Sequence, residues 1–393
     1  MRLLSICGML AAGEFLASFA PCCAEAWPAV ALALLVVALF GYGLAVRGWA
    51  LATCFLLGVM LFLLASTAEE KRYRDCPWMR GREWCVRKPS VDADVRRTLK
   101  RDLSRRIAIG LGEKGETVCL SRAILLGERN RLPYRTKRIF VESGTMHVFA
   151  ISGLHVMAIA RVLTIVLSLL LVPSRLAGVL ACPLLWAYVY LIGWSPSAVR
   201  AAIMMTFQSA APLAWRRPNG LRSWALTFLL VHVSNPLLIV NVGNALSFLV
   251  MLAIVLTGEV GRDLPKWKQG LLVTFAAWAV GVPISAHVFG RVTPGGLVAN
   301  LLLIGVAKLT VYMGALGLMA SYVSELLASY FNNLSALAIR AMIFIAEVVS
   351  CFPGANVETG SWTLFACIGW YAALAVLAAG FFCRMRAKRD FWT

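Results

Sequence analysis

Histidine, serine and arginine side chains interrupt two strongly apolar stretches of the chain. His147, Ser152 and His155 stand at the start of one apolar run, and Arg200 stands in a second run. A polar side chain in hydrocarbon costs free energy unless it meets a partner or water. Ser152 and His155 are three residues apart and share one helix face, while Gly153 lets another backbone approach closely. The pattern predicts that this face lines a wet passage.

The same side chains have other interpretations. Ser152 and His155 have the types of a nucleophile and its base, but no acidic residue that would orient the histidine stands beside them. We therefore expect no enzymatic activity. Histidines also occur, hydrogen-bonded, in dry helix bundles, and Arg200 is compatible with an ion pair to Glu259 or Glu347. The sequence leaves these two structural alternatives open.

The composition is that of a polytopic membrane protein. Of 393 residues, 60% are hydrophobic and 15% are charged, which is too apolar for a soluble globule. Runs of roughly 20 apolar residues mark membrane helices, and they predict an all-α fold with about 12 of them. The first resembles a signal peptide, but Glu14 interrupts its apolar core and favours an uncleaved helix. The predicted spans are 3–23, 28–46, 49–66, 146–171, 175–193, 196–214, 222–241, 243–261, 269–289, 295–320, 334–351 and 361–383.

Basic residues are distributed unevenly over the predicted loops. If the N-terminus is in the cytoplasm, the inner loops and both termini together carry 13 Lys and Arg, and the short outer loops hold only Arg291. Because short cytoplasmic loops are enriched in Lys and Arg, we predict a multi-pass membrane protein with both termini cytoplasmic. The long polar segment 67–143 then lies outside the cytoplasm, and its length exempts its positive charge from this rule.

The segment 94–112 has the pattern of an amphipathic helix. Val95, Leu99, Leu103 and Ile107 recur every four residues and define an apolar stripe. Such a helix lies at a membrane surface or gathers a polyanion such as DNA by its charge, and both interpretations are open. The candidate DNA-gathering residues are Arg96, Arg97, Lys100, Arg101, Arg105 and Arg106.

The rest of the polar segment contains two predicted helices, over 116–128 and 134–143, and two cysteines. Cys76 and Cys85 are either free thiols or, outside the cytoplasm, a hairpin disulfide, and the sequence does not decide between these. The sequence contains neither a CxxC motif nor a His/Cys cluster that would predict a metal. It also lacks the GxxxxGK[ST] motif that would predict ATP binding. We expect no metal and no cofactor.

Four stretches carry polar, Gly or Pro residues at places where a bare membrane helix would not need them. In one of them Pro196 stands near the start of a predicted helix, which positions Ser195 to cap it. The four are LLGERNRLP (125–133) leading into GTMHVFAISGLHV (144–156), IGWSPSAVRAAIMM (192–205), SNPLLIVNVGNALSF (234–248) and GVPISAHVFGRVTPGGLVANLLL (281–303). Together they resemble the ComEC family of competence proteins, the inner-membrane channel that takes up transforming DNA. The resemblance covers about residues 95–320.

The resemblance implies that the chain translocates single-stranded DNA during natural transformation. Membrane lipids would surround the channel, and the DNA receptor, the nuclease and the cytoplasmic ATP-driven motor would be separate proteins. Two other functions are open: a transporter of a small or lipidic anion, and a degenerate membrane protein that transports nothing. The residues expected along the DNA path are His147, Ser152, Gly153, His155, Ser195, Ser197, Arg200, Asn235, His287 and Asn300.

The chain departs from the family pattern in three places. Residues 67–93 are too short for the family's OB-like domain, and the metal motif of its metallo-β-lactamase-like domain is absent, so the chain resembles a short form. Asn241, Asn244 and Ala245 stand where the family has an Asp and a Phe-Gln. The expected domains are N-terminal membrane helices (1–66), the extracytoplasmic basic segment (67–143), the channel core (144–320), and C-terminal membrane helices with a cytoplasmic tail (321–393).

Overall fold

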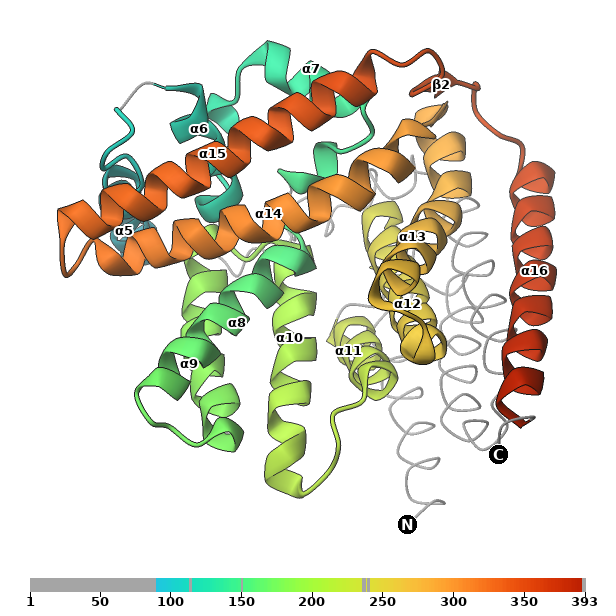
Figure 1. The fold of residues 1–393 in the computed structure, drawn as a ribbon, viewed down its shortest axis with the longest axis horizontal. Coiled ribbons are helices and arrows are strands. Elements are labelled where there is room, and N and C mark those ends of the chain that lie inside the picture. Colours follow the sequence, from blue (N-terminus) through green and yellow to red (C-terminus); the bar gives the residue numbers. More distant parts are fainter. Residues whose placement is uncertain (1–89, 113–114, 150, 235–237, 239–240, 391–393) are drawn as a thin grey trace. The chain divides into compact units, whose positions relative to one another are not determined.

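The computed structural model describes residues 90–112, 115–149, 151–234, 238 and 241–390 (Figure 1). Most of these residues are helical, and the only strands among them form one sheet, in which β1 (Arg291–Val292) pairs with β2 (Val357–Glu358). The predicted all-α class is therefore confirmed. The first three predicted spans, Cys76, Cys85 and Asn235 lie outside the described residues.

The described chain forms two compact units. The larger unit comprises residues 90–223 and 292–358, and the smaller unit comprises residues 224–291 and 359–390. The domain boundaries expected from the sequence stay a prediction. The larger unit contains α5 (Ser90–Ile107), α6 (Glu116–Leu126), η2 (Arg129–Arg131), α7 (Tyr134–Glu142), η3 (Met146–Val148), α8 (Gly153–Leu169), α9 (Ser174–Ile192), α10 (Pro196–Ala210), η4 (Ala211–Ala214), α14 (Gly295–Ala320) and α15 (Glu325–Ser350). The smaller unit contains α12 (Val242–Val260), η6 (Gly261–Asp263), α13 (Lys266–Phe289) and α16 (Leu364–Asp390), and α11 (Gly220–Ser234) begins in the larger unit and continues in the smaller.

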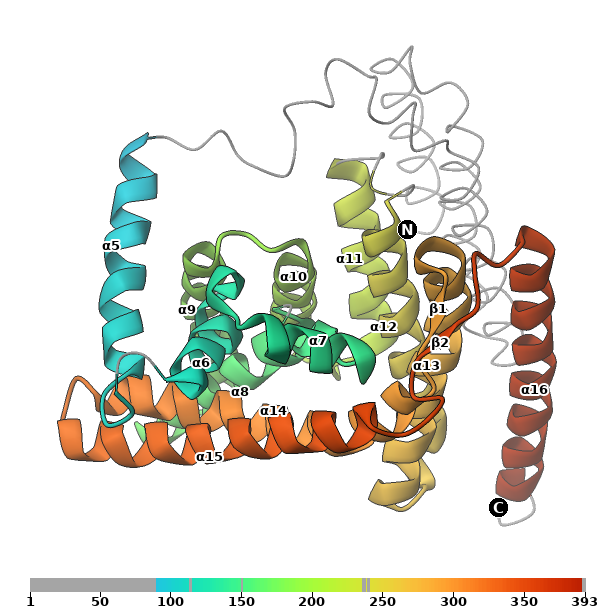
Figure 2. The same ribbon diagram turned by 90° about the horizontal axis from the view of Figure 1, so that it is seen from above.

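Several helices of the larger unit pack against two long helices, α14 and α15. α14 and α15 have 26 residues each, which at 1.5 Å per residue makes each about 39 Å long. A short turn joins them, and they lie side by side in both views (Figures 1 and 2). α8 packs against α14, α7 packs against α15, and α6 contacts both long helices. α14 and α15 therefore hold together α6, α7 and α8, which overlap or adjoin the motifs at 125–133 and 144–156.

α6 lies at the centre of the hydrophobic core. The buried residues of this helix include Leu120, Ile124, Leu125 and Leu126, each at most 2% exposed. Gly127 ends the helix in the left-handed conformation, with φ of 73°; its N–H donates to the Ala123 carbonyl and the N–H of Glu128 donates to the Arg122 carbonyl, as in a typical C-cap. The helix predicted over 116–128 is therefore present, and it is a core element although the surrounding sequence is polar.

α5 is docked mainly by its C-terminal half. The exposed fraction along its apolar stripe falls from 59% at Val95 and 42% at Leu99 to 2% at Ile107. The predicted stripe is thus not one continuous surface, because its last part packs into the protein core. The N-terminal half extends away from α14 and α15 (Figure 2). The helix ends at Ile107 rather than at 112, since Gly110 follows with φ of 81°, a conformation that a helix does not adopt.

Polar side chains of two neighbouring helices hold the end of α5. The buried Arg122 guanidinium of α6 donates to the Ser104 carbonyl through Nε at 3.2 Å and Nη2 at 3.0 Å. Asn332 of α15 donates through Nδ2 to the carbonyls of Arg106 at 3.0 Å and Ile109 at 3.1 Å. Carbonyls at the end of a helix and in the turn after it lack the regular helical hydrogen bond, and these side chains supply donors to them. The two side chains therefore fix the direction in which the basic helix projects.

Six described helical segments are long and apolar enough to cross a membrane. They are 146–169, 242–263, 266–289, 295–320, 325–350 and 364–381, and they match six of the predicted spans in order. α10 and α11 have only 15 residues each, fewer than the roughly 20 that a membrane crossing takes. The predicted number of about 12 crossings and the predicted orientation therefore stay predictions.

The smaller unit is built around α13. α12 and α16 both pack against this helix, and Val280, Ile284 and Tyr371 belong to their shared core. Buried ring groups reach backbone carbonyls of α13: Tyr371 Oη donates to Val280 at 3.0 Å, and Trp370 Nε1 donates to Ala279 at 2.9 Å. Pro283 inside α13 leaves backbone groups unbonded, and the thiol of Cys367 lies 3.7 Å from its carbonyl.

The close approach of α6 and α14 gives a stability prediction. A methyl group added at Gly314 would lie 2.5 Å from Leu125 Cδ1, whereas one added at Gly305 of the same helix meets nothing within 4 Å. We expect Gly314→Ala to lower the free energy of unfolding by about 1–3 kcal/mol, because the buried leucine cannot move aside. Gly305→Ala should raise it by about 0.5–1 kcal/mol, since alanine favours the helix.

Thermal unfolding of both variants in the same detergent provides the measurement. Equal shifts of Tm for the two substitutions would show that α6 and α14 do not make this contact.

Candidate nucleic-acid interface

Ser152 and His155 form the N-terminal cap of α8. Ser152 precedes the helix in an extended conformation, with φ of −107° and ψ of 171°. Its backbone N–H donates to Nδ1 of His155 at 3.2 Å, and its Oγ lies 3.0 Å from the same nitrogen. Nδ1 accepts from a backbone N–H, so a neutral ring carries its proton on Nε2. The side-chain pair predicted to share a helix face is therefore present, and the local cap fixes its geometry.

The other ring nitrogen of His155 has no partner. His155 is 1% exposed, and its Nε2 is buried without a hydrogen bond in the part of the chain that the structure describes. A buried N–H without a partner is uncommon, because it loses its water and gains nothing in return. In a serine hydrolase, a carboxylate orients the histidine through the ring nitrogen that does not face the serine. Here that nitrogen is Nε2, and it has no carboxylate partner among the described residues. The pair is arranged as a cap, and the expected lack of hydrolytic activity stays a prediction.

Three turns of the larger unit meet at Ile151. Ser197 of α10 donates its hydroxyl to the Ile151 carbonyl. A methyl group added at Gly127 would lie 2.8 Å from Ile151 Cδ1 and 3.9 Å from the Ile192 carbonyl. The turn after α6 (127–129), the turn before α8 (144–152) and the turn between α9 and α10 (193–197) are thus in contact. We call this meeting point the three-turn junction. It brings together two of the four sequence motifs.

Ser195 and Arg200 occupy the α10 side of the junction. Ser195 is the residue before the helix, and Pro196 is the first helical residue, as predicted. The expected side-chain cap is absent, however, because Ser195 Oγ lies 3.4 Å from Ser197 Oγ and accepts no hydrogen bond from the helix backbone. Arg200 follows Ser197 by three residues on the same helix and is partly buried.

Two basic residues of α5 face the junction. The Arg96 guanidinium lies beside Gly193, since a methyl group added there would be 3.3 Å from Nη1. Burial lowers the pKa of Lys100, while the carboxylate of Glu128 opposes this shift and the charge of Arg96 adds to it. Lys100 therefore lies near the turn that follows α6. Arg97, Arg101 and Arg105 are exposed on the rest of the helix.

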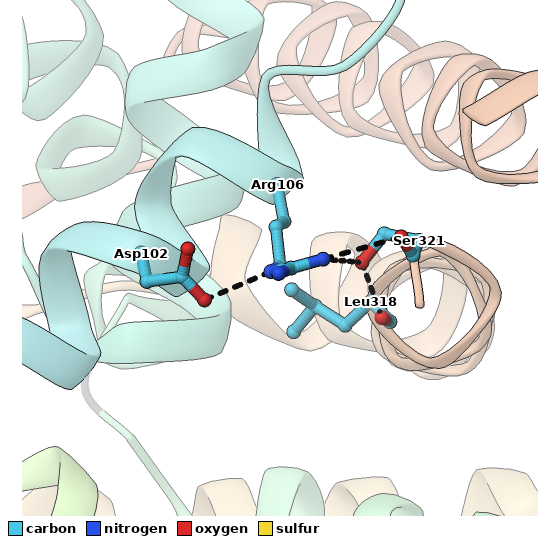
Figure 3. Close-up of polar contacts among 4 residues, drawn as sticks. All are labelled: Asp102, Arg106, Leu318 and Ser321. Carbon is cyan, nitrogen blue, oxygen red and sulfur yellow. Dashed lines mark hydrogen bonds and ion pairs between the residues drawn. The ribbon is translucent and has the colours of Figure 1, made fainter. Parts of the chain in front are cut away.

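Arg106 has a different environment from the other basic residues of α5. Its Nε donates to Asp102 Oδ2 at 2.8 Å, and its Nη1 donates to the carbonyl and Oγ of Ser321 at 3.2 and 3.4 Å (Figure 3). The guanidinium also lies 3.9 Å from the centre of the Tyr322 ring, within the range of cation–π contacts. Ser321 Oγ donates in turn to the Leu318 carbonyl at 2.7 Å. Arg106 thus attaches α5 to the end of α14.

A second imidazole and a guanidinium lie near His155. The imidazole of His147, in η3, is exposed, and Arg129, in η2, is also exposed. Both side chains act electrostatically on the His155 ring. Partial desolvation lowers the pKa of Arg129, but an arginine stays charged at neutral pH. The sequence prediction included His147 and missed Arg129, although Arg129 stands in the LLGERNRLP motif that leads into the histidine segment.

The remaining predicted residues are dispersed. Asn300 lies on α14 four residues after Gly296, which contacts Gly144, and its Oδ1 is buried without a partner among the described residues. Gly153 is the first residue of α8. His287 belongs to the smaller unit, where its Nδ1 lies 2.7 Å from the Trp362 carbonyl. The structure therefore does not place His287 relative to the three-turn junction.

The sequence prediction also missed His232, which lies in the smaller unit. Its Nδ1 donates to the Phe228 carbonyl at 2.8 Å, and its Nε2 lies 3.0 Å from Asn244 Nδ2. The second Asn244 N–H donates to the Leu238 carbonyl at 2.8 Å. A neutral imidazole satisfies this arrangement, since it has one donor and one acceptor nitrogen. Asn244 stands near the position of the family's Asp, so the departure noted in the sequence coincides with an uncharged buried pair.

Comparisons with known proteins identify one family. The family model described as "Competence: Competence protein" matches residues 124–383. The "ComE operon protein 3" of Bacillus subtilis (strain 168) is 26% identical over 233 residues, which cover 58% of this chain and 30% of that protein. The "Uncharacterized protein YcaI" of Escherichia coli (strain K12) is 25% identical over 198 residues, 46% of this chain and 26% of that protein. The chain thus spans less than a third of the length of these relatives. No solved structure matches.

The environment of Lys100 gives a test of the junction's electrostatics. Because Glu128 stabilises the charged ammonium, Glu128→Gln should lower the pKa of Lys100 further. Because Arg96 destabilises the ammonium, Arg96→Gln should raise the pKa of the same lysine. NMR titration of 13C-methylated lysines, with Lys100→Arg for assignment, provides the measurement. A Lys100 pKa that neither substitution moves would show that α5 does not lie beside the turn after α6.

Proposed function

The chain belongs to the competence protein family, and on that premise we propose that it is an inner-membrane channel that translocates single-stranded DNA during natural transformation. The family resemblance that four motifs predict is confirmed, and the match to residues 124–383 extends beyond the predicted range to include most of α16. Membership of this family and similarity to the Bacillus protein support a role in DNA-uptake competence. The finer statement, that the chain itself conducts a DNA strand, is our proposal.

The observation that carries the proposal is the gathering of basic and hydrogen-bonding side chains at the three-turn junction. Arg96 and Lys100 face it from α5, Ser197 and Arg200 stand on its α10 side, and His155 stands at the start of α8. A single DNA strand carries a negative charge at each phosphate, so its path needs cations and polar groups along it. Contacts must also be weak and repeated so that the strand leaves again.

We assign the collection of DNA to the exposed basic residues of α5. Arg97, Arg101 and Arg105 are four residues apart and exposed, so they share one side of a helix whose N-terminal half projects from the unit (Figure 2). Electrostatic attraction there would deliver the strand to the junction. With no ATP-binding motif in the sequence, a separate motor drives transport in this proposal, and a separate receptor and nuclease present and degrade the DNA.

One observation favours the second candidate, a transporter of a lipidic anion. A cavity of about 150 Å³ lies among α5, α6, α8, α9 and α14, and apart from Tyr188 its lining consists of apolar side chains such as Leu126, Ile159 and Leu191. Leu191 and Leu126 are close in sequence to the junction. A hydrocarbon chain fits such a lining and a DNA backbone does not. Binding of DNA and of lipid by the purified chain separates the two functions.

Uptake of DNA should depend on Arg200. In a transformable host that lacks the chromosomal gene, the variant Arg200→Gln should lower internalisation of labelled DNA and transformation frequency by about 10-fold or more, because it removes a cation that meets phosphate, worth about 1.5–3 kcal/mol. The matched control is Arg217→Gln, an exposed arginine in the loop after the same helix. Unchanged internalisation by the Arg200 variant at equal protein level would contradict the channel assignment.

The salt dependence of DNA binding separates the two roles that we assign to arginines of α5. Removing an exposed cation by Arg101→Gln should reduce the slope of log K against log salt concentration by about 0.7 for oligo-dT. Arg106→Gln should instead destabilise the docking of α5 and increase hydrogen exchange at residues 103–107, because it breaks the contacts to Asp102 and Ser321. Fluorescence anisotropy and hydrogen-exchange mass spectrometry measure the two effects. The reverse outcome would exchange the two roles.

A further inference from the structure

We infer that His155, Arg129 and His147 form a site for one phosphodiester group, at the N-terminal end of α8 and beside the three-turn junction. The inference deepens the proposed function, since the phosphodiester is the repeating charged group of a DNA strand. The same group is also the charged part of a phospholipid headgroup. The chemistry is therefore shared by two sources, and the experiment below distinguishes them.

The first step of the argument is the unused donor on His155. The cap with Ser152 occupies Nδ1 at 3.2 and 3.0 Å, so the proton of a neutral ring lies on Nε2. That N–H is buried and has no partner in the described chain, and the side chain is 1% exposed. The protein holds the ring in place by one nitrogen and leaves the other available as a donor. An acceptor from outside the chain would satisfy it.

The second step is the charge around that donor. The charged guanidinium of Arg129 acts on the His155 ring, the imidazole of His147 lies near it, and no carboxylate acts on it among the described residues. Glu128, the carboxylate next in sequence to Arg129, acts on Lys100 instead. The N-terminus of α8 adds a partial positive charge. Donor, cation and helix end therefore favour an anion with several acceptor oxygens.

The third step is the contrast between Arg129 and other arginines of the larger unit. Arg106 is paired with Asp102, and Arg138 is paired with Glu142 at 2.7 Å. Arg129 has no carboxylate partner in the ranges that the structure describes. A guanidinium presents a planar set of donors that matches two oxygens of one phosphate. Arg129 is thus the residue expected to fix the anion, with His155 as the buried donor.

The experiment uses the full chain in dodecyl maltoside micelles, which contain no phosphate. Only four histidines are present in the chain, so 15N labelling of histidine resolves each ring. Dimethyl phosphate, a minimal phosphodiester, should shift the His155 Nε2 resonance in a saturable manner. Arg129→Gln should weaken this binding about 10-fold or more, as loss of a hydrogen bond to a charged group does. His155→Ala should also weaken it, and the Arg129 variant keeps the test valid if the alanine variant fails to fold.

The matched control and the competing ligands decide what the result means. Arg138→Gln, which removes an exposed and paired arginine, should bind dimethyl phosphate as the unchanged protein does. Competition by oligo-dT supports a DNA source, and competition by phosphatidylglycerol alone supports a lipid source and overturns the proposed function while the site stands.

Two outcomes overturn the site itself. One is the absence of a His155 shift at any dimethyl phosphate concentration. The other is salt-sensitive oligo-dT binding that Arg129→Gln and His155→Ala leave unchanged, a result that would preserve the proposed function and reject this site.

Discussion

The packing of α6 against α14 is the constraint on which the larger unit depends. Gly314 lets Leu125 approach the backbone of α14 more closely than a side chain at that position would permit. Leu125 also offers its carbonyl to Tyr188 Oη of α9 at 3.1 Å, so one residue of α6 connects two other helices. The left-handed Gly127 then turns the chain directly after this contact. The position of the three-turn junction therefore follows from a close contact in the core.

The arginines of the larger unit show how a strongly basic chain distributes its charge. Arg122 is buried and donates to a backbone carbonyl, and Arg106 bridges a carboxylate and the end of α14. These two stabilise the fold and are occupied. Arg129 and Arg101 have neither kind of partner among the described residues and keep their charge available. An internal partner already uses the donors of an arginine, so Arg122 and Arg106 have fewer donors left for a ligand than Arg129 and Arg101.

Local patterns in the sequence predicted much of the fold correctly. Apolar runs gave the positions of the six described membrane-length helices, and Pro196 marked the start of α10. The side on which a helix is buried was predicted less well, because it depends on contacts between residues far apart in the sequence. Asn332 and Arg122 hold the end of α5, and neither is visible in the pattern of that helix. Its apolar stripe therefore predicted one surface where the structure has two environments.

At the candidate site, too, contacts between residues close in sequence were predicted better than contacts between residues far apart in sequence. The spacing of Ser152 and His155 predicted their contact, since residues three apart in a helix are neighbours. The sequence prediction missed Arg129, because its proximity to His155 results from the turn after α6. No periodic pattern in the sequence indicates that proximity. The cap that Ser195 was expected to provide is absent, because its hydroxyl lies beside Ser197 instead. Short-range geometry was thus predictable at the start of α8, and the surroundings of that helix were not.

The side chains along α8 limit where a charged strand can run. Ser152 and His155 stand at its start, but Ile159, one turn after His155, already lines the apolar cavity, as do Val162 and Leu163. A phosphate that followed this face further would lose its water without gaining a partner, at a cost of several kcal/mol for each charge. In the proposed channel, α8 would therefore supply an entrance and not the length of a pore. In the proposed channel, a strand that enters at the junction would have to leave α8 within its first turn, and Arg200 of α10, one turn after Ser197, is the cation to which we assign the next contact.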